Sequence, residues 1–415
     1  MPAQFSRTPT VTQQHARAAV AALFLTNGAL IANLLPRYPE IKSALALGNT
    51  TYGLTIAALP TGAIAAGLFA AALIRRFGSA PVAVIGTVGT SIAILLAGIS
   101  PSAGLFAVGL FLAGALDAIT DVAQNAHALR VQREYRRSIL NSFHAVWSIG
   151  AVLGGSMAAA AIALNVPLGW HLGVSALVFA IVALVALRFC LPGPDQVAQQ
   201  PDGPGQGTSA AAARGGGPSR TPVSGRTVLV LLAFVLVAIS GALVEDAGNS
   251  WAALYLSADL GAPAALAATG YIALVGAQTV GRLLGDRLVD RYGQRAVARA
   301  GGVIVTVGMG TALALPTVPG TIAGFALAGF GVATLVPAAM SEANDLPGLR
   351  PGTGLTVVSW LMRLGFLASP PVVGLVADAT SLRVGLLVVP LAGVLVVLLA
   401  GVLSGRRRRT ITAPG

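Results

Sequence analysis

The sequence predicts an all-α membrane protein whose twelve transmembrane helices form two pseudo-symmetric six-helix bundles. Three observations support this fold class: the chain is strongly apolar, long apolar runs recur along it, and its two halves align with each other. Hydrophobic residues make up 55% of the 415 residues and charged residues only 10%, whereas a soluble protein carries about 25% charged residues. The apolar runs are continuous rather than alternating, which favours helices over the strands of a membrane barrel.

Each apolar run is about 20 residues long, which is enough for one helix to cross a hydrocarbon core of roughly 30 Å. In chain order, the expected spans cover residues 17–36, 53–74, 81–99, 104–126, 140–163, 169–189, 227–247, 264–285, 297–316, 320–341, 353–376 and 382–404. The first span follows a polar lead without a small-residue cleavage pattern. We therefore interpret it as a retained helix and not as a cleaved signal.

One long break divides the spans into six and six. Residues 190–226 are rich in Pro, Gly, Ala and Ser, and such a composition is typical of a flexible linker. The predicted organisation is an N-terminal bundle (1–189), a cytoplasmic linker (190–226), a C-terminal bundle (227–405) and a basic cytoplasmic tail (406–415).

The two halves align at a constant offset of 215 residues. The matching pairs are Leu73 with Leu288, Arg76 with Arg291, Gly78 with Gly293, Gly114 with Gly329, and Gly150 with Gly365. A single register that holds across three elements indicates a duplicated six-helix unit. Parallel repeats of this kind are a transporter architecture, with substrate sites near the midplane between the halves.

Membrane topology explains the net charge of +12 better than nucleic-acid binding does. Arg37, Lys42 and Arg383 fall in loops on one side, and Arg363 falls inside a span. We assign the remaining Lys and Arg residues to the tails, the linker and the alternate loops. Because Lys and Arg concentrate in cytoplasmic loops, both termini are expected in the cytoplasm, for a multi-pass protein of the plasma (inner) membrane. The basic tail can also contact anionic lipid headgroups of the bilayer.

The residues that could build an enzyme or metal site are scarce. The four His and the one Cys show no metal-ligand spacing, and Cys190 alone permits no internal disulfide. A GxxxxGK[ST] phosphate loop is absent from the sequence, so ATP coupling is not supported. We expect no enzymatic activity, no cofactor and no metal.

Two acids lie one helical turn apart in the fourth span. Asp117, Asp121 and Asn125 share a helical face, and an acid that faced lipid at this depth would cost several kcal/mol, so the face is expected to look into protein or a wet cavity. A carboxylate that is removed from water takes up a proton more readily. Either acid is thus a candidate for proton coupling or substrate binding. The alternative is structural, with Asp121 neutralising Arg130 and Arg133.

The duplication sharpens this interpretation. At the offset of 215, Val332 and Val336 stand where the first half has its acids, so the duplicated scaffold does not require them. The other intramembrane charge is Arg363, near mid-depth in the eleventh span. We expect Arg363 to meet Asp117 or Asp121 across the halves, to contact an anionic substrate group, or to pair within its own half.

Other polar residues are further candidates for lining a cavity. His144 opens the fifth span and is a candidate proton relay, although an interfacial role fits equally. Trp147 and Trp251 are candidates for stacking on a sugar ring, although Trp is also the usual interface anchor. The remaining candidates are Asn27 and Asn33 in the first span, Glu245, Asp246 and Asn249 near the outer end of the seventh, and Gln278 in the eighth.

The run GDRLVDRYGQR, residues 285–295, resembles the signature loop of the major facilitator superfamily, and span count, linker and duplication extend the resemblance to nearly the whole chain. The matching residues are Gly285, Asp286, Arg287, Asp290, Arg291, Gly293 and Arg295. In the first half the corresponding loop, ALIRRFGSA, is degraded, with Arg75 in the place of Asp290. We interpret the 285–295 loop as a gating latch whose arginines pair with its acids or with carbonyls at neighbouring helix ends. The alternative is a charged loop that only sets topology.

Two stretches resemble the sugar-permease branch of the superfamily, which includes fucose permease and uncharacterised bacterial relatives. They are Asp121-Val-Ala-Gln-Asn125 in the fourth span and Leu140-Asn141-Ser-Phe-His144 at the start of the fifth. Drug/proton antiporters usually carry an Arg in the region of Val108–Gly114 and a Pro before the glycine pair of the fifth span; both are missing here. These departures weigh against export.

The resemblance implies a secondary transporter that moves a small organic solute by alternating access. We expect proton-coupled symport of a sugar-like substrate by a monomer, without nucleic acid as a partner. The alternatives are a drug or metabolite exporter that works by proton antiport, and a non-transporting membrane sensor on the same fold.

Overall fold

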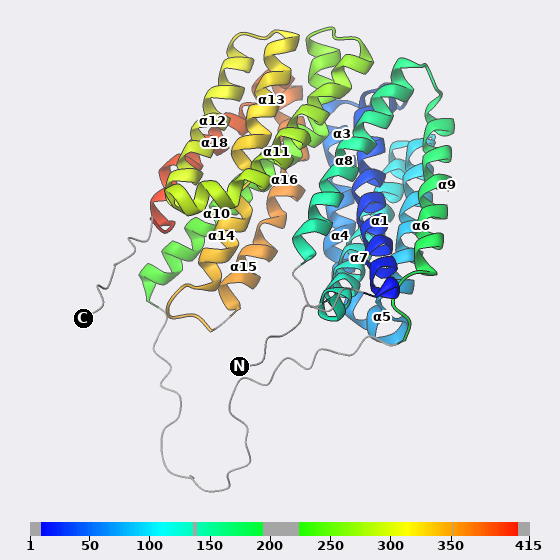
Figure 1. The fold of residues 1–415 in the computed structure, drawn as a ribbon. Helices are drawn as coiled ribbons and strands as arrows, with labels where there is room; N and C mark the ends of the chain where they lie inside the picture. Colours follow the sequence, from blue (N-terminus) through cyan, green and yellow to red (C-terminus); the bar gives the residue numbers. More distant parts are fainter. Residues whose placement is uncertain (1–9, 136–138, 194–223, 351, 406–415) are drawn as a thin grey trace, which may run out of the picture.

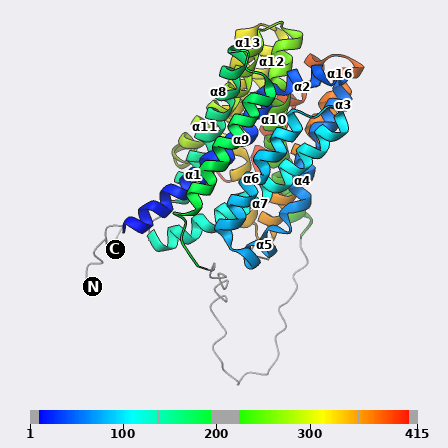
Figure 2. The ribbon, with the colours of Figure 1, turned by 90° about the vertical axis from the view of Figure 1, so that its right-hand side faces the viewer.

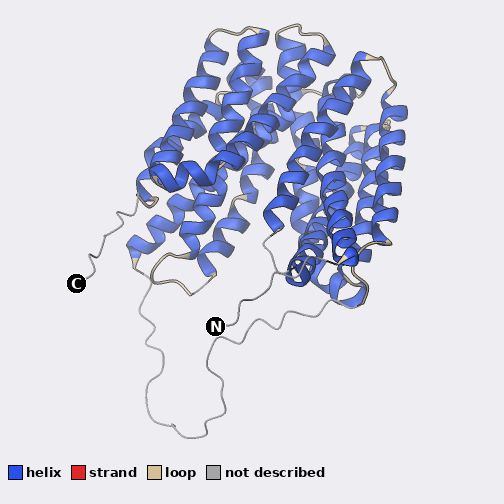
Figure 3. Ribbon diagram, in the orientation of Figure 1, coloured by secondary structure: helices blue, strands red, loops and turns tan. Residues whose placement is uncertain are grey.

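The computed structural model describes residues 10–135, 139–193, 224–350 and 352–405, and this part of the chain consists of helices joined by loops, without strands (Figure 1 and Figure 3). Within these residues, eleven helices are long and apolar enough to cross a membrane, and the bent helix pair 49–67 and 70–77 supplies a twelfth span. The predicted twelve-helix membrane fold is therefore confirmed. Most of the proposed linker and the whole basic tail lie outside the described residues.

The first bundle contains α1 (Val11–Leu34), η1 (Leu35–Arg37), α2 (Tyr38–Ala44), α3 (Asn49–Ile56), α4 (Ala58–Gly67), α5 (Ala70–Phe77), α6 (Ser79–Gly98), α7 (Ala103–Tyr135), α8 (Leu140–Ala163) and α9 (Leu168–Leu187). The second contains α10 (Gly225–Leu254), η2 (Tyr255–Asp259), α11 (Ala264–Tyr292), α12 (Gln294–Ala314), α13 (Val318–Val332), α14 (Leu335–Asn344), α15 (Thr353–Leu361), α16 (Arg363–Ala379), α17 (Leu382–Gly385), α18 (Val388–Leu399) and η3 (Ala400–Val402).

The duplication in the sequence recurs in the packing of the helices. In the first bundle α7 crosses α4 so closely that a Cβ on Gly114 would lie 2.0 Å from the carbonyl oxygen of Leu59. In the second, α13 crosses α11, and a Cβ on Gly329 would lie 2.0 Å from the carbonyl oxygen of Leu274. Leu274 and Gly329 each lie 215 residues after their counterparts in the first bundle, Leu59 and Gly114. Glycines let helix backbones meet where lipid provides no hydrophobic drive for association, so the same crossing is built twice.

The two bundles lie side by side and come together at one end (Figure 1). We call the end where α1 begins, α9 ends and α10 begins the terminal end, and the opposite end the closed end. Figure 2 shows α2 and α3 at the closed end and α5 at the terminal end. At the closed end α3 packs on α16 of the other bundle, where a Cβ on Gly53 would lie 2.3 Å from the carbonyl oxygen of Pro370.

Polar contacts also join the bundles at the closed end. The Asp378 carboxylate of α16 accepts hydrogen bonds from the backbone N–H groups of Asn49, at 3.1 Å, and Thr50, at 2.8 Å. The hydroxyl of Tyr52 donates to the carbonyl oxygen of Ser250 at 2.8 Å. The N-terminus of α3 is thus completed by the second bundle.

Among the described residues, four predicted spans are interrupted rather than continuous. Breaks occur between α4 and α5 after Gly67, between α13 and α14 after Val332, between α15 and α16 at Met362, and between α17 and α18 after Gly385. The span of α3, α4 and α5 bends by 54° at its break. Transporters use such discontinuous helices to line substrate cavities, because the exposed backbone groups need a polar surrounding.

Three helices run well past the ends that the apolar pattern predicted. α7 continues to Tyr135, α10 to Leu254 and α11 to Tyr292, because the polar residues that follow each apolar run include neither proline nor a helix-stopping turn. Glu245, Asp246 and Asn249 consequently lie inside α10, in the half of the helix that runs toward the closed end.

Candidate functional site

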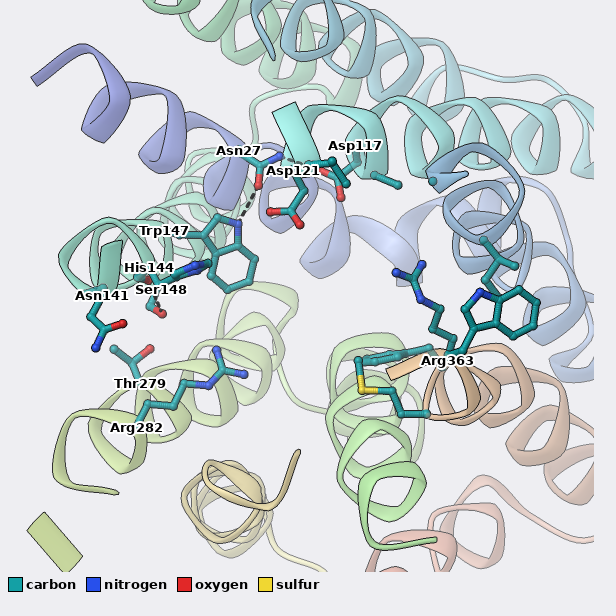
Figure 4. Close-up of a pocket in the computed structure, with 18 of the residues that line it drawn as sticks. Asn27, Asp117, Asp121, Asn141, His144, Trp147, Ser148, Thr279, Arg282 and Arg363 are labelled. Atoms are coloured by element: carbon teal, nitrogen blue, oxygen red, sulfur yellow. Dashed lines mark hydrogen bonds between the residues drawn. The ribbon is translucent and has the colours of Figure 1, made fainter. Parts of the chain in front are cut away.

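A cavity of about 1010 Å³ lies between the two bundles. It extends toward the terminal end, where Asn141 at the start of α8 and Asp286 in the last turns of α11 line it. The polar residues of its wall are Asn27, Asp117, Asp121, Asn141, His144, Trp147 and Ser148 from the first bundle, and Thr279, Arg282, Asp286 and Arg363 from the second. Most of the polar wall is contributed by α7 and α8, with α11 and α16 facing them (Figure 4).

Asn27 of α1 holds the first of the two α7 acids in place. Its amide nitrogen donates to Oδ1 of Asp117 at 2.7 Å, and its amide oxygen accepts from the indole Nε1 of Trp147 at 2.7 Å (Figure 4). The carboxylate accepts up to four hydrogen bonds, and this contact uses only one of them. Asp117 is therefore positioned by a chain of hydrogen-bonded side chains and retains capacity to accept from a further donor.

Asp121 lies one turn along α7 and is exposed on the cavity wall. Its Oδ1 accepts a hydrogen bond from the Asn125 amide at 3.0 Å. Because α7 is one continuous helix, Arg130 lies about 13 Å further along its axis. The Arg130 guanidinium instead donates to the carbonyl oxygen of Gly193 at 2.9 Å. The geometry gives no support to the alternative in which Asp121 neutralises Arg130.

Arg363 is the first residue of α16 and lines the cavity from the second bundle. One guanidinium nitrogen lies 4.0 Å from where a Cβ on Gly67 would stand, so the side chain reaches the break between α4 and α5. Among the described residues Arg363 forms no ion pair. The expected pairing with Asp117 or Asp121 is absent in this conformation, because the open cavity separates α16 from α7 (Figure 4).

Arg282 is a cavity residue that the sequence analysis missed. The prediction that it lies in a loop is wrong: Arg282 lies inside α11, and its side chain points into the cavity (Figure 4). The available signal was its position within the predicted span 264–285. An arginine inside a span is expected to face protein or water, as Arg282 does.

Glu245 of α10 provides an acid for the second bundle. Its Oε2 accepts a hydrogen bond from the amide nitrogen of Gln278 at 2.7 Å and lies 3.6 Å from Arg282. These residues line a smaller cavity of about 220 Å³ together with Val332 and Val336. Val332 and Val336, which occupy the positions of the α7 acids in the second half, therefore lie in the same cavity wall as Glu245 of α10. Aligning the two halves of the sequence could not reveal this acid, because it comes from a different helix.

Four of the remaining candidates lie away from the cavity wall. Asn33 is buried between α1 and α9, where its Oδ1 lies 2.9 Å from Nε2 of His171. Trp251 is fully buried at the closed end, with its ring 5.0 Å from that of Tyr52. Asp246 and Asn249 each have a buried side-chain oxygen without a hydrogen-bond partner among the described residues. The structure does not place these four side chains in the open cavity.

His144 is a further predicted site residue that lies at the cavity. His144 lines the cavity and packs edge-on against Phe24, with ring centroids 5.3 Å apart.

The 285–295 run forms the last turns of α11 and the turn into α12, where Gly293 has φ +83°. Nε of Arg295 donates to the carbonyl oxygen of Leu403 at 3.0 Å. Within the described chain neither acid of this run forms an ion pair, and the latch stays a prediction.

Comparisons with known proteins agree with this architecture. A family model of the Major Facilitator Superfamily matches residues 20–287 and 230–415. An uncharacterized transporter, y4wD, of Sinorhizobium fredii is 30% identical over 377 residues, covering 90% of this chain and 94% of that protein. The membrane protein MosC of Rhizobium meliloti is 28% identical over 377 residues, covering 91% of this chain and 87% of that protein.

Solved structures show the same fold at low sequence identity. The nucleoside transporter NupG covers 94% of this chain and 98% of its own, with a TM-score of 0.69 at 14% identity. A bacterial homologue of the lysosomal transporter Spinster, in an inward-facing and occupied conformation, covers 95% and 97% with a TM-score of 0.72 at 14% identity. A D-xylose-proton symporter covers 94% and 96% with a TM-score of 0.68 at 16% identity. With its twelve spans, its duplicated bundles and a family match along nearly its whole length, this multi-pass membrane protein is a transporter of the Major Facilitator Superfamily.

Proposed function

We propose that the protein is a proton-coupled secondary transporter that carries a small polar, sugar-like solute through the cavity between its bundles. The observation that carries this proposal is the chain of hydrogen bonds from Trp147 through Asn27 to Asp117 at the cavity wall. This chain holds a carboxylate at the cavity wall, beside an aromatic ring and several hydrogen-bonding groups. We infer that the transporter acts as a monomer.

The orientation in the membrane follows from charge. Arginines gather at the terminal end, among them Arg75, Arg76, Arg133 and Arg188, and basic residues are retained on the cytoplasmic side. The terminal end is accordingly cytoplasmic in this proposal, within the plasma membrane. The cavity then faces inward, and the closed end seals it from the outside.

The closed end has the features of a gate that opens. Its contacts are a few hydrogen bonds and two helix pairs that pack across the bundles, α3 with α16 and α8 with α11. It also buries polar atoms of Asp246, Asn249 and Trp251 that have no hydrogen-bond partner among the described residues. A buried polar group without a partner costs about 1–3 kcal/mol. If this end opened, these atoms would form hydrogen bonds with water. Their burial therefore reduces the free-energy difference by which the inward-facing state is favoured over the outward-open state. Alternating access requires two states that are close in free energy.

A solute of modest size with many hydrogen-bonding groups fits this cavity. Asn141, His144, Ser148 and Thr279 supply donors and acceptors, and the Trp147 ring supplies an apolar face. Sites of this kind combine an apolar surface with a few placed polar groups that fix orientation. The structural neighbours named for nucleoside transport and D-xylose-proton symport carry solutes of this class, which supports the same class here.

Proton coupling follows from the cost of closing a charged cavity. When the bundles close around a solute, the α7 carboxylates lose water, and a carboxylate without compensation is costly there. Uptake of a proton by Asp117 or Asp121 would remove that cost. The charged form would then be released on the side where the cavity reopens to water.

Flux measurements in proteoliposomes test the proposal. A thermal-shift screen of sugars, sugar acids, nucleosides and drugs selects the solute, and its uptake is then measured with and without an inward proton gradient. Asp117→Asn with Asp121→Asn should abolish gradient-driven accumulation while preserving solute counterflow, whereas Asp345→Asn, at an exposed site, should retain both. Accumulation by the double variant at unchanged pH dependence would falsify proton coupling through α7. Accumulation against an opposite gradient would assign antiport, and an absence of flux for every binding solute would favour a sensor.

A further inference from the structure

A second cavity, of about 810 Å³, lies at the terminal end of the first bundle. It is bounded by α5, by the last turns of α7 and by the segment that follows α9. Its arginines come from all three elements and are Arg75, Arg76, Arg130, Arg133 and Arg188. None of the described residues that line it is an acid. Converging guanidinium groups without a compensating carboxylate produce a strong positive potential in a concave site.

Most of these guanidinium groups are available to a ligand. Arg130 is engaged, because it donates to the carbonyl oxygens of Pro192 and Gly193. Arg75, Arg133 and Arg188 form neither an ion pair nor a hydrogen bond with any other described residue. Their side chains are exposed within the cavity and at its rim.

The rest of the cavity wall suits an amphipathic anion. The first turn of the 20-residue helix α6 lines it, and its N-cap residue, Gly78, has no side chain to cap the helix. The partial positive charge of a helix N-terminus favours phosphate oxygens. The opposite part of the wall is apolar, with Ile74, Leu129 and Leu187. Arginine and apolar surface therefore meet in one hollow at the level where the spans end.

The duplicated half shows that the fold does not require this basic cavity. At the offset of 215 residues, Asp290 stands in the place of Arg75 and Asp286 in the place of Ala71. The hollow at the corresponding turn of the second bundle, about 460 Å³, is lined by residues such as Leu288, Tyr292 and Phe330, and none of the described residues that line it is charged. Membrane topology needs arginines on this side, but it does not need them to converge on one cavity.

We propose that this cavity is a binding site for a phosphate group, supplied by the headgroup of an anionic phospholipid. Arg75, Arg133 and Arg188 would surround the phosphate, and the apolar wall would receive the upper part of the acyl chains. Val122 lines both this cavity and the solute cavity. A bound headgroup would thus lie one side chain away from the solute and against α5, beyond the 54° bend. Free phosphate shares the headgroup's chemistry and is the other source that the experiment must separate.

The test measures binding of soluble probes to the purified full-length protein. Dioctanoyl phosphatidylglycerol, dioctanoyl phosphatidylcholine and inorganic phosphate are each titrated, with calorimetry and thermal shift as readouts. The site variant is Arg75→Gln with Arg133→Gln. The control is Arg226→Gln with Arg350→Gln, which removes the same charge from exposed residues at the terminal end of the second bundle. Arg188→Gln, which lies after the end of α9, is a second variant that leaves every helix unchanged.

We expect phosphatidylglycerol to bind the site variant roughly 30-fold more weakly than the wild type, and Arg188→Gln roughly 5-fold more weakly. The control should bind as the wild type does. Preference for phosphatidylglycerol over inorganic phosphate assigns a lipid headgroup; equal binding of inorganic phosphate, lost in the same variants, assigns a free phosphate ion at the same site. Equal affinity for phosphatidylcholine, or an equal loss in the site and control variants, would overturn the proposal.

Discussion

The carboxylate of Asp378 in the second bundle caps helix α3 of the first bundle, accepting a hydrogen bond from the backbone N–H of Thr50 at 2.8 Å. The N-cap residue of α3 is Gly48, which has no side chain to do so. A helix in one bundle is therefore completed by a residue of the other, and only while the closed end is shut. This contact couples the stability of α3 to the conformation of the transporter.

Removing this cap should open the closed end. A carboxylate cap contributes about 0.5–2 kcal/mol, so Asp378→Ala should raise the ratio of outward-open to inward-open molecules by roughly 2- to 30-fold. Pulsed-EPR distances between spin labels at Leu164→Cys and Leu315→Cys, exposed residues of the two bundles at the closed end, report that ratio. The labelling background is Cys190→Ser, since Cys190 is the one native cysteine.

Gly48→Ser distinguishes the effect of the cap on the gate from its effect on the stability of α3. Gly48 has φ −63°, which a serine adopts without strain, and its hydroxyl would cap α3 from within the first bundle. Asp378→Ala combined with Gly48→Ser should keep the thermal stability of the wild type and still favour the outward-open state. An unchanged distance distribution in both Asp378 variants would show that the cap does not hold the gate.

Asn27 and Trp147 should contribute to transport as one unit. The indole donates to the Asn27 amide at 2.7 Å, and the same amide donates to Asp117. Asn27→Ala leaves both partners without their hydrogen bond, whereas Trp147→Phe removes only one donor. We expect a coupling of about 0.5–1.5 kcal/mol in a double-mutant cycle on the solute dissociation constant. Strictly additive losses would mean that Asn27 does not organise the site.

The close crossing of α4 and α7 should tolerate no side chain at Gly114. An added Cβ would stand 2.0 Å from the Leu59 carbonyl oxygen, and overpacking of this kind costs about 1–3 kcal/mol. Gly114→Ala should therefore lower the melting temperature by several degrees. Gly276→Ala is the matched control within a helix, because nothing lies within 4 Å of its added Cβ, and it should be neutral or slightly stabilising. An equal change in melting temperature for the two substitutions would contradict the close contact between α4 and α7 at Gly114.

Arg363 should meet the α7 acids when the cavity closes. In the open conformation it faces them and forms no ion pair with any described residue (Figure 4). Closure of the bundles brings α16 toward α7. Arg363→Ala and Asp121→Ala should each reduce solute flux, and the double variant should lose less than the sum of the two losses. Independent losses would place Arg363 in contact with the solute alone. Arg226→Ala, outside the cavity, serves as the charge control and should leave flux unchanged.

Much of the architecture could be predicted because membrane folding depends on local properties. The length and apolarity of each run set the spans, and the register of Gly114 with Gly329 revealed a duplication that the structure repeats in its backbone contacts. The α7 acids could be assigned to a protein-facing surface because lipid does not tolerate them. Arg282 was missed although the same reasoning applied to it, since we took the end of α11 for a loop.

The site itself depended on how the two bundles meet, and no local pattern contains that relationship. Asn33 and Asn27 carry the same amide group and lie on the same helix. Asn33 nevertheless pairs with His171 inside the bundle, whereas Asn27 pairs with Asp117 at the cavity. Helix breaks at Gly67 and Met362, the pairing of Glu245 with Arg282, and the capping of α3 by Asp378 all join residues from different helices. The sequence alone was enough to specify twelve spans, their duplication and the helix that carries the acids, because burial in lipid acts on each helix separately. Which polar groups face the cavity, and which close it, was decided by the tertiary structure, because a hydrogen bond requires two partners to be brought within about 3 Å of each other.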